Sequence, residues 1–227
     1  MSTLSQLNYS IFQAINSMAG HNPWLDATMA FSADMLIFFL PILLVLAWGR
    51  PLNWRREPLS SSETAELQER RATVLWIIVA CLLSFGLNLL IEQFIFEPRP
   101  FISHHIHVLI AHSADGSFPS DHSAWAFAVV GMFALQIIAA FIATRGQSDR
   151  TNHLRLLAFP ALLTIAALVI ACLIGFARIF VGVHYPGDIL GGAFDGLLAA
   201  GIVTPLRRWL SRPTNAVLSL AHLLHLA

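Results

Sequence analysis

The chain has 227 residues, of which 56% are hydrophobic and only 11% are charged, and its formal net charge is zero. Soluble globular proteins usually carry about 25% charged residues, so this composition, arranged in long uncharged runs, is typical of a protein embedded in lipid. A neutral chain has no general attraction to nucleic acid. The two cysteines, Cys81 and Cys172, lie in apolar runs, where buried thiols are expected rather than a disulfide. The N-terminus lacks the basic stretch that begins a signal peptide, so no signal peptide is expected.

The first predicted element, residues 3–19, is an amphipathic helix. Its apolar residues recur at spacings of three and four, with polar residues between them. They are Leu4, Leu7, Ile11, Ile15 and Met18. A helix with this pattern is expected to lie in the membrane interface, although insertion as a sixth membrane helix stays open.

Five apolar stretches are long enough to cross a hydrocarbon core of ~30 Å as helices, which takes about 20 residues. They span residues 27–48, 72–96, 123–143, 156–176 and 189–206. They do not alternate as barrel strands do, and in lipid the remaining way to satisfy backbone groups is a helix. The sequence therefore predicts an all-α integral membrane protein with one membrane-embedded domain, residues 1–227. Residues 207–227 form a cytoplasmic tail with a short apolar run.

The arginines predict how the chain is oriented, and all 13 basic residues are arginine. Most lie in three segments that five crossings bring to one side of the membrane. These are Arg50, Arg55, Arg56, Arg70, Arg71, Arg145, Arg150, Arg155, Arg207, Arg208 and Arg212. Because cytoplasmic loops carry the excess of positive charge, the N-terminus is predicted outside and the C-terminus inside. Arg99 and Arg178 are the exceptions, and both fall on the outer side.

Three polar clusters follow at the predicted outer helix ends, and their residue types suit phosphoryl chemistry. Arg99 and Arg178 can each bind phosphate oxygens with two N–H groups. Ser120 precedes an apolar helix, where an N-cap and free backbone N–H groups favour an anion. A turn between His184 and Asp188 would let the carboxylate accept one ring N–H and leave the other nitrogen free to attack phosphorus.

The third candidate catalytic group in these clusters, after His184 and Asp188, is His122, the natural general acid for a leaving group. In chain order the clusters read Arg99-Pro100, Pro119-Ser120-Asp121-His122 and Arg178-x5-His184-x3-Asp188. In this order and spacing they resemble the signature of the type 2 phosphatidic acid phosphatase superfamily, K-x6-RP, PSGH and SR-x5-H-x3-D.

Three positions depart from the family signature: Glu92 stands for its lysine, Asp121 for the glycine of PSGH and Ala177 for the serine before Arg178. Within the superfamily, Glu92 and the stretch around Asp121 resemble the undecaprenyl-diphosphatase branch associated with bacitracin resistance. Both residues are kept as possible accessory site residues, although for Glu92 a structural role beside an arginine or a polar neighbour such as Asn88 is the expected one.

The resemblance implies hydrolysis of the terminal phosphate of undecaprenyl diphosphate at the outer face of a bacterial inner membrane. It implies a phosphohistidine on His184, oriented by Asp188, with His122 as acid and then base. Arg99, Arg178 and Ser120 hold the phosphate, and no cofactor or metal is implied. The expected partners are the polyprenyl diphosphate and membrane lipids, with no nucleic acid, and the oligomeric state stays undetermined. The alternatives are a phosphatase or phosphotransferase for phosphatidic acid or phosphatidylglycerophosphate, and a transporter of an anionic lipid.

Other polar residues near the same face have no assigned role from sequence. The outer loop holds His104, His105, His107 and His112, which could bind metal, contact the substrate or headgroups, or form an ordinary loop. Asp195 lies seven residues beyond Asp188 and is expected to be structural. Asp26 and Asp34 are expected to cap a helix or pair with a neighbouring group.

Overall fold

A computed structural model describes residues 3–49, 61–144 and 150–224 of the chain. The described residues form helices joined by short segments, and their sole β-pairing is an isolated bridge between Pro98 and Gly116. The elements in chain order are α1 (Thr3–Asn16), α2 (Pro23–Asp34), the 3-10 helix η1 (Leu36–Phe39), α3 (Leu40–Trp48), α4 (Ser61–Glu92), α5 (Pro100–Ser103), α6 (Asp121–Thr144), α7 (Arg150–Phe180), α8 (Pro186–Trp209) and α9 (Ser211–Leu223).

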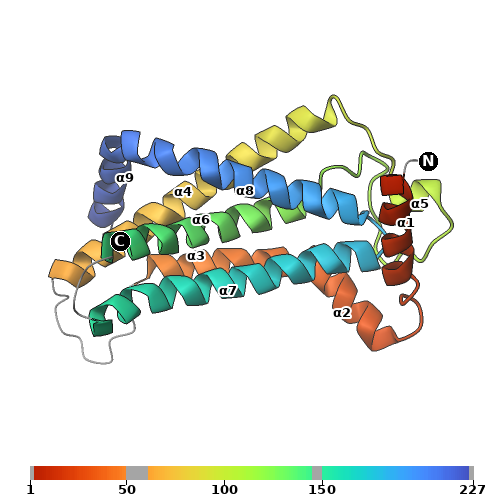
Figure 1. Ribbon diagram of the computed structural model, residues 1–227, viewed down its shortest axis with the longest axis horizontal. Helices are drawn as coiled ribbons and strands as arrows, with labels where there is room; N and C mark the ends of the chain where they lie inside the picture. The colour runs from red at the N-terminus through yellow and green to blue at the C-terminus, as the bar shows by residue number, and fades with distance from the viewer. Residues whose placement is uncertain (1–2, 50–60, 145–149, 225–227) are drawn as a thin grey trace.

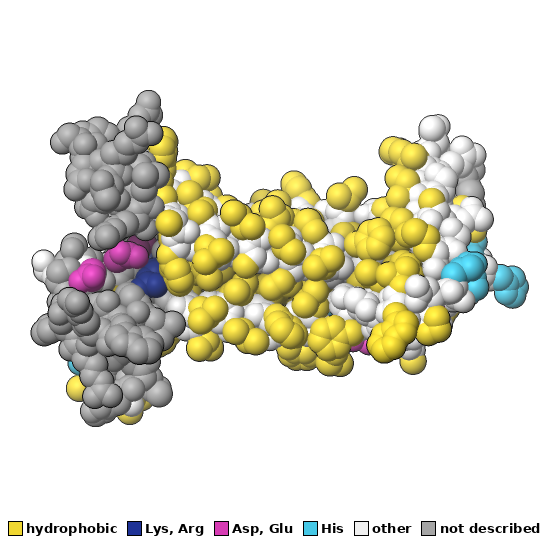
Figure 2. Space-filling view, turned by 90° about the horizontal axis from the view of Figure 1, so that it is seen from below, with side chains coloured by type: hydrophobic (Ala, Val, Ile, Leu, Met, Phe, Trp, Pro, Cys, Tyr) yellow, Lys and Arg dark blue, Asp and Glu magenta, His cyan; other side chains and the backbone are white. Residues whose placement is uncertain are grey.

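Four long helices, α4, α6, α7 and α8, make the bundle, and α6 packs against the other three (Figure 1). The core between them contains fully buried apolar side chains, among them Ile77, Phe133, Ile174 and Val203. The outside of the bundle is apolar too: Figure 2 shows hydrophobic side chains covering the middle of the face in view, with charged groups at one end and histidines at the other. Such a surface is stable only against lipid.

The prediction of one continuous helix over residues 27–48 is wrong, because the chain bends by 58° between α2 and the segment formed by η1 and α3. Met35 closes α2, and the next turn is 3-10 before Pro41 stands in the first turn of α3. Proline fits a first helical turn because its missing N–H has no partner there, but it cannot continue a helix from the preceding turn. The described residues therefore contain four helices that are long and apolar enough to cross a membrane, or five such spans if the bent pair counts as one.

Three other helix boundaries near the candidate site differ from the prediction. Helix α7 continues to Phe180, so Arg178 lies in its last turn and not at the start of the following helix. Helix α8 begins at Pro186, which puts Asp188 in its first turn. Helix α4 ends at Glu92, four residues earlier than predicted.

Helix α1 lies across the end of the bundle (Figure 1) and docks through polar groups. Asn16 donates through Nδ2 to the carbonyl oxygens of His107 and Phe180, at 2.7 and 2.9 Å. Asn8 accepts from the Gly187 N–H at 2.8 Å. Leu4, Leu7 and Ile11, part of the apolar stripe predicted from the sequence, are exposed. This is the face that an interfacial helix would turn toward lipid, and the interfacial location itself stays a prediction.

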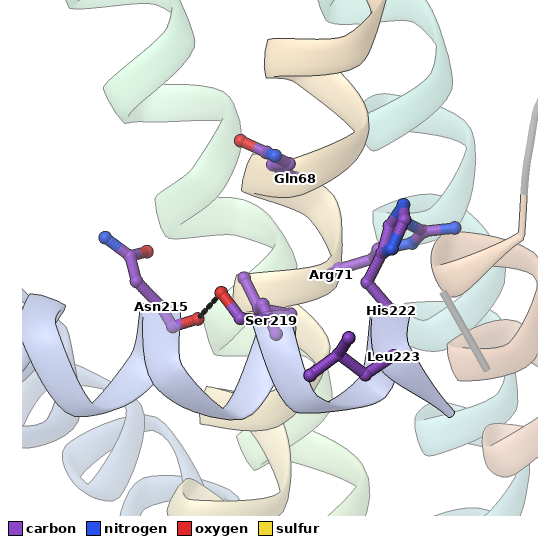
Figure 3. A pocket seen from close by; sticks show the side chains of 7 residues that line it. Gln68, Arg71, Asn215, Ser219, His222 and Leu223 are labelled. Atoms are coloured by element: carbon purple, nitrogen blue, oxygen red, sulfur yellow. Dashed lines mark hydrogen bonds between the residues drawn. The ribbon is translucent and has the colours of Figure 1, made fainter. Parts of the chain in front are cut away.

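Helix α9 covers the opposite end of the bundle, where the Trp76 indole N–H donates to Thr214 at 3.1 Å. A cavity of about 470 Å³ lies between α4 and α9, with Arg71 and His222 among its lining residues (Figure 3). It shares no residue with the three polar clusters. Among the arginines behind the predicted orientation, Arg50, Arg55, Arg56 and Arg145 lie outside the described residues, whereas α4, α8 and α9 bring Arg70, Arg71, Arg207 and Arg212 to this end.

Candidate active site

The fold brings the three polar clusters together at the α1 end of the bundle. Arg99 precedes α5, Ser120 precedes α6, and Arg178 lies in the last turn of α7. His184 lies in the α7–α8 turn, and Asp188 lies in the first turn of α8. All five are buried, with at most 5% of each residue exposed. Burying two arginines among polar groups is costly unless each group is paired, so the cluster indicates function rather than stability.

His184 lies between the two arginines. Its Nε2 is 3.2 Å from Arg99 Nη1 and 3.3 Å from Arg178 Nη2, and its Nδ1 is 3.3 Å from Asp188 Oδ2. A guanidinium group can only donate, so Nε2 carries the lone pair and Nδ1 carries the proton directed at Asp188. Asp188 Oδ2 also accepts the Tyr185 N–H at 2.7 Å, which fixes the carboxylate. The arrangement presents a nucleophilic nitrogen to a group held by both arginines.

The charge state of His184 agrees with this tautomer. Burial, followed by the positive charges of Arg178 and Arg99 and by His112, holds the pKa of His184 well below its ordinary value of 6.5. The ring is therefore neutral at pH 7, since neither the low-polarity surroundings nor the neighbouring cations favour a second proton.

Each arginine has an acidic partner that the sequence analysis did not assign to it. Arg99 Nε is 2.7 Å from Asp115 Oδ1, and Arg178 Nη1 is 3.3 Å from Asp34 Oδ1. The bend after α2 brings Asp34 to this position. A buried guanidinium requires a counter-charge, so the sequence did indicate that each arginine needs an acidic partner. It did not indicate which one, because several carboxylates on the outer side could serve.

The first turn of α6 contributes hydroxyl groups. The Ser120 carbonyl accepts the Ala124 N–H at 2.9 Å, which places Ser120 at the N-cap position, as predicted. The buried hydroxyls of Ser120 and Ser123 have no hydrogen-bond partner within the described part of the chain. Because a buried hydroxyl costs free energy when unpaired, both are suited to bind a phosphoryl oxygen near the N-terminus of α6.

His122, also in this turn, is half-buried and lies within electrostatic reach of His184 and both arginines. Its neighbour Asp121 is turned to α4, where Asn88 Nδ2 donates to its Oδ1 at 2.7 Å. Asn88 thus pairs with Asp121, not with Glu92 as one reading of the sequence allowed. Glu92 is exposed at the end of α4.

Asp195 and the histidine loop take separate places. Ser84 donates to Asp195 Oδ2 at 2.7 Å between α4 and α8, which agrees with the structural role expected for Asp195. The His104 ring lies 4.2 Å from the Tyr9 ring, while His112 Nε2 is 2.9 Å from Arg178 Nη2. In the described ranges, no three His, Cys, Asp or Glu side chains are grouped so that they could hold a metal ion.

The site contains a neutral histidine that is oriented by an aspartate and lies between two buried arginines, at the end of an apolar bundle. These groups suit a membrane phosphatase that acts on lipid phosphates. The chain belongs to the PAP2 superfamily, whose family model matches residues 73–212. This confirms the resemblance read from the three motifs.

Two curated relatives agree with the family, and one solved structure shares the fold. The undecaprenyl-diphosphatase BcrC of Bacillus subtilis (strain 168) is 32% identical over 185 residues, which cover 82% of this chain and 76% of that protein. Phosphatidylglycerophosphatase B of the same organism is 34% identical over 183 residues, covering 78% and 72%. The crystal structure of a transmembrane PAP2-type phosphatidylglycerolphosphate phosphatase from Bacillus subtilis shares the fold, with a TM-score of 0.59, 22% identity, and 93% and 90% coverage. The protein is thus an integral membrane hydrolase of lipid phosphates.

Proposed function

We propose that this protein is an undecaprenyl-diphosphate phosphatase of the bacterial inner membrane, with its active site at the outer face. It would release the terminal phosphate and return undecaprenyl phosphate, the lipid carrier, for reuse. The observation that carries the proposal is the geometry at His184, whose Nε2 lies between Arg99 and Arg178 while Nδ1 faces Asp188. The lipid tail would remain against the apolar bundle.

In the first step, His184 Nε2 attacks the terminal phosphorus and the bond to the bridging oxygen breaks. Arg99 and Arg178 hold the phosphoryl oxygens as charge spreads over them in the transition state. Asp188 accepts the Nδ1 proton in a hydrogen bond and stabilises the positive ring of the phosphohistidine. The bound diphosphate brings negative charge beside His122, which favours the protonated ring, and His122 then donates this proton to the departing undecaprenyl phosphate.

In the second step, water attacks the phosphohistidine. The now neutral His122 takes a proton from this water, the phosphorus–nitrogen bond breaks, and inorganic phosphate leaves with His184 restored. Two fixed arginines supply the charge neutralisation that other phosphatases obtain from metal ions, so the mechanism uses no metal.

The choice of undecaprenyl diphosphate rests on the relative named for that activity. A phosphatase for phosphatidylglycerophosphate is the second candidate, because a relative of similar identity carries that name. Transport of an anionic lipid is disfavoured, since transporters place their polar groups near the bilayer midplane, whereas here they gather at one end of the bundle.

The test is phosphate release from undecaprenyl diphosphate by purified protein in detergent with EDTA, beside His184→Ala. The wild type is expected to turn over with EDTA, and His184→Ala to lose at least about a thousand-fold in kcat, because the attacking group is gone. His105→Ala, in the exposed part of the outer loop, serves as the control and should match the wild type.

The substrate panel separates the alternatives. Release from phosphatidylglycerophosphate or phosphatidic acid alone would keep the site but overturn the substrate. Loss of wild-type activity in EDTA would contradict the metal-free mechanism, and folded protein silent on every lipid phosphate would favour binding or transport.

A further inference from the structure

The outer loop between α5 and α6 is anchored on both sides of a short segment, His112–Asp115. Before the segment, the Leu109 N–H donates to the Val181 carbonyl at 3.2 Å. After it, the Ser117 N–H donates to the Glu97 carbonyl at 2.8 Å, beside the bridge of Pro98 with Gly116. The loop is thus attached to the backbone next to His184 and to the backbone next to Arg99, which holds His112 and Asp115 against the site.

Both ends of this segment contact an arginine of the site. Asp115 Oδ1 is 2.7 Å from Arg99 Nε, and its other oxygen accepts the Ser113 hydroxyl at 2.6 Å. His112 Nε2 is 2.9 Å from Arg178 Nη2. Asp115 is 58% exposed at its side chain whereas Arg99 is 7% exposed, so the carboxylate meets the buried guanidinium from the solvent side.

These contacts determine which guanidinium atoms face the nucleophile. With Nε of Arg99 bound to Asp115, its Nη1 is directed to the Val183 carbonyl at 3.0 Å and to His184 Nε2 at 3.2 Å. Arg178 is fixed similarly: Nη1 faces Asp34, and Nη2 lies between His112 and His184. A planar guanidinium held at two edges keeps its orientation when a phosphoryl group arrives.

His112 has the protonation state that this role requires. Burial, together with the charges of Arg99 and Arg178, lowers the pKa of His112, so its ring is neutral at pH 7. Neutral imidazole can accept the Arg178 N–H at Nε2 while Nδ1 faces the Ser113 carbonyl at 3.3 Å.

We propose that His112 and Asp115 are positioning residues of the phosphatase site, each of which fixes one of the two phosphate-binding arginines. The proposal rests on the function proposed above, since it assumes that Arg99 and Arg178 bind the phosphoryl group. Neither residue takes part in a covalent step. They preorganise the donors that stabilise the transition state.

The experiment measures kcat and KM for His112→Leu, His112→Gln, Asp115→Leu and Asp115→Asn, with His105→Leu as the control in the same loop. The leucine variants are expected to lose about 10- to 100-fold in kcat/KM, because an ångström of misplacement costs up to this much. Glutamine and asparagine keep an oxygen that can accept the arginine N–H, so they should recover most of the activity with an unchanged pH profile.

A double-mutant cycle tests whether each residue acts through its arginine. His112→Leu should add little to the loss already caused by Arg178→Lys, and Asp115→Leu little to that caused by Arg99→Lys, because the contact is already gone. Full additivity in both pairs would overturn the proposal. So would wild-type kcat/KM in the leucine variants, or a His112→Gln variant as impaired as His112→Leu with a shifted acid limb, which would make His112 a proton donor.

Binding of inorganic phosphate to the same variants gives a readout independent of turnover and of the lipid chosen. The leucine variants should bind phosphate at least about tenfold more weakly than the wild type and the amide variants, since misoriented donors lose charge-assisted hydrogen bonds. If undecaprenyl diphosphate is not cleaved but phosphate binding follows this order, the proposed substrate fails and the positioning role stands. Equal phosphate affinity in folded variants overturns the positioning role alone.

Discussion

In the proposed mechanism, the protonation state of the His184 ring decides whether its Nε2 can attack phosphorus. A histidine in water titrates near pH 6.5, where much of it would carry a second proton and lose its lone pair. Here burial and the charges of Arg178 and Arg99 hold the pKa of His184 well below that value. In the proposed mechanism, the two arginines that hold the phosphate therefore also keep the attacking histidine unprotonated.

A pH prediction follows from the direction of this shift. As pH falls, wild-type His184 stays neutral until the lowered pKa is reached, so kcat/KM should show no loss of nucleophile around pH 6.5. Arg99→Gln removes one cause of the shift, raises the pKa of His184 and should move the acid limb upward. The substrate phosphate, with its own pKa of about 6, titrates equally in both assays. The ratio of wild-type to variant kcat/KM should therefore rise as pH falls from 8 to 5, and a constant ratio would contradict it.

The residues to which the proposed mechanism assigns binding and attack could be selected from the sequence, whereas the residues that contact them could not. Arg99, Ser120, Arg178, His184 and Asp188 stand in motifs whose order and spacing indicate phosphoryl chemistry, and the structure brings them together. Their partners Asp34, Asp115 and His112 belong to no motif. Which carboxylate reaches which arginine depends on the path of a loop and on the bend after α2, and neither leaves a periodic pattern.

At the scale of elements, the site depends on how closely α8 approaches α6. Gly192 and Gly196 lie at the crossing, where a Cβ on Gly192 would meet the Ser120 carbonyl oxygen and one on Gly196 the Ala124 carbonyl oxygen. Small residues let helices in membranes approach in this way. The close approach allows the Ser120 N–H to donate to the Asp188 carbonyl at 3.1 Å, which joins the two helix starts that carry the site.

Gly196→Ala should therefore weaken both the fold and the activity. The added methyl group forces α8 away from α6, at a cost of about 1–3 kcal/mol in the free energy of unfolding, and displaces Asp188 relative to Ser120. Thermal unfolding in detergent and phosphate release measure the two effects. Gly201→Ala is the matched control on the same helix, since its Cβ would have no neighbour within 4 Å, and it should gain up to about 1 kcal/mol in helix propensity. Equal behaviour of the two variants would refute the close-approach argument.

Apolar runs were a good guide to the existence of the long helices and a poorer guide to their ends. Hydropathy places α4, α6, α7 and α8, because each must satisfy its backbone in lipid. It does not register that residues 27–48 bend by 58°, since the chain is apolar on both sides of the break at Met35. The predicted helix over residues 156–176 also ends before Arg178, whereas α7 includes Arg178 as a buried charge paired with Asp34.

At the scale of the whole molecule, the two ends of the bundle differ in their charged groups. The α1 end buries Arg99 and Arg178 in the site, whereas the α9 end carries the exposed Arg212 and the partly buried Arg207, which pairs with Glu69 at 2.7 Å. Surface arginines favour the cytoplasmic side. Because a lipid carrier released outside the cell must be dephosphorylated there, the proposed function requires the α1 end to face outward.

Cysteine labelling tests this orientation directly. In a background with Cys81→Ala and Cys172→Ala that retains phosphate release, single cysteines replace Ser10 on α1 and Ser211 at the start of α9, both exposed. A membrane-impermeant maleimide added to intact spheroplasts should label position 10 and leave position 211 unlabelled until the membrane is permeabilised. The reverse pattern would place the site in the cytoplasm and exclude the proposed role. Labelling of position 10 only after detergent would show that α1 is inserted in the bilayer, because the exposed stripe of Leu4, Leu7 and Ile11 would then lie below the interface.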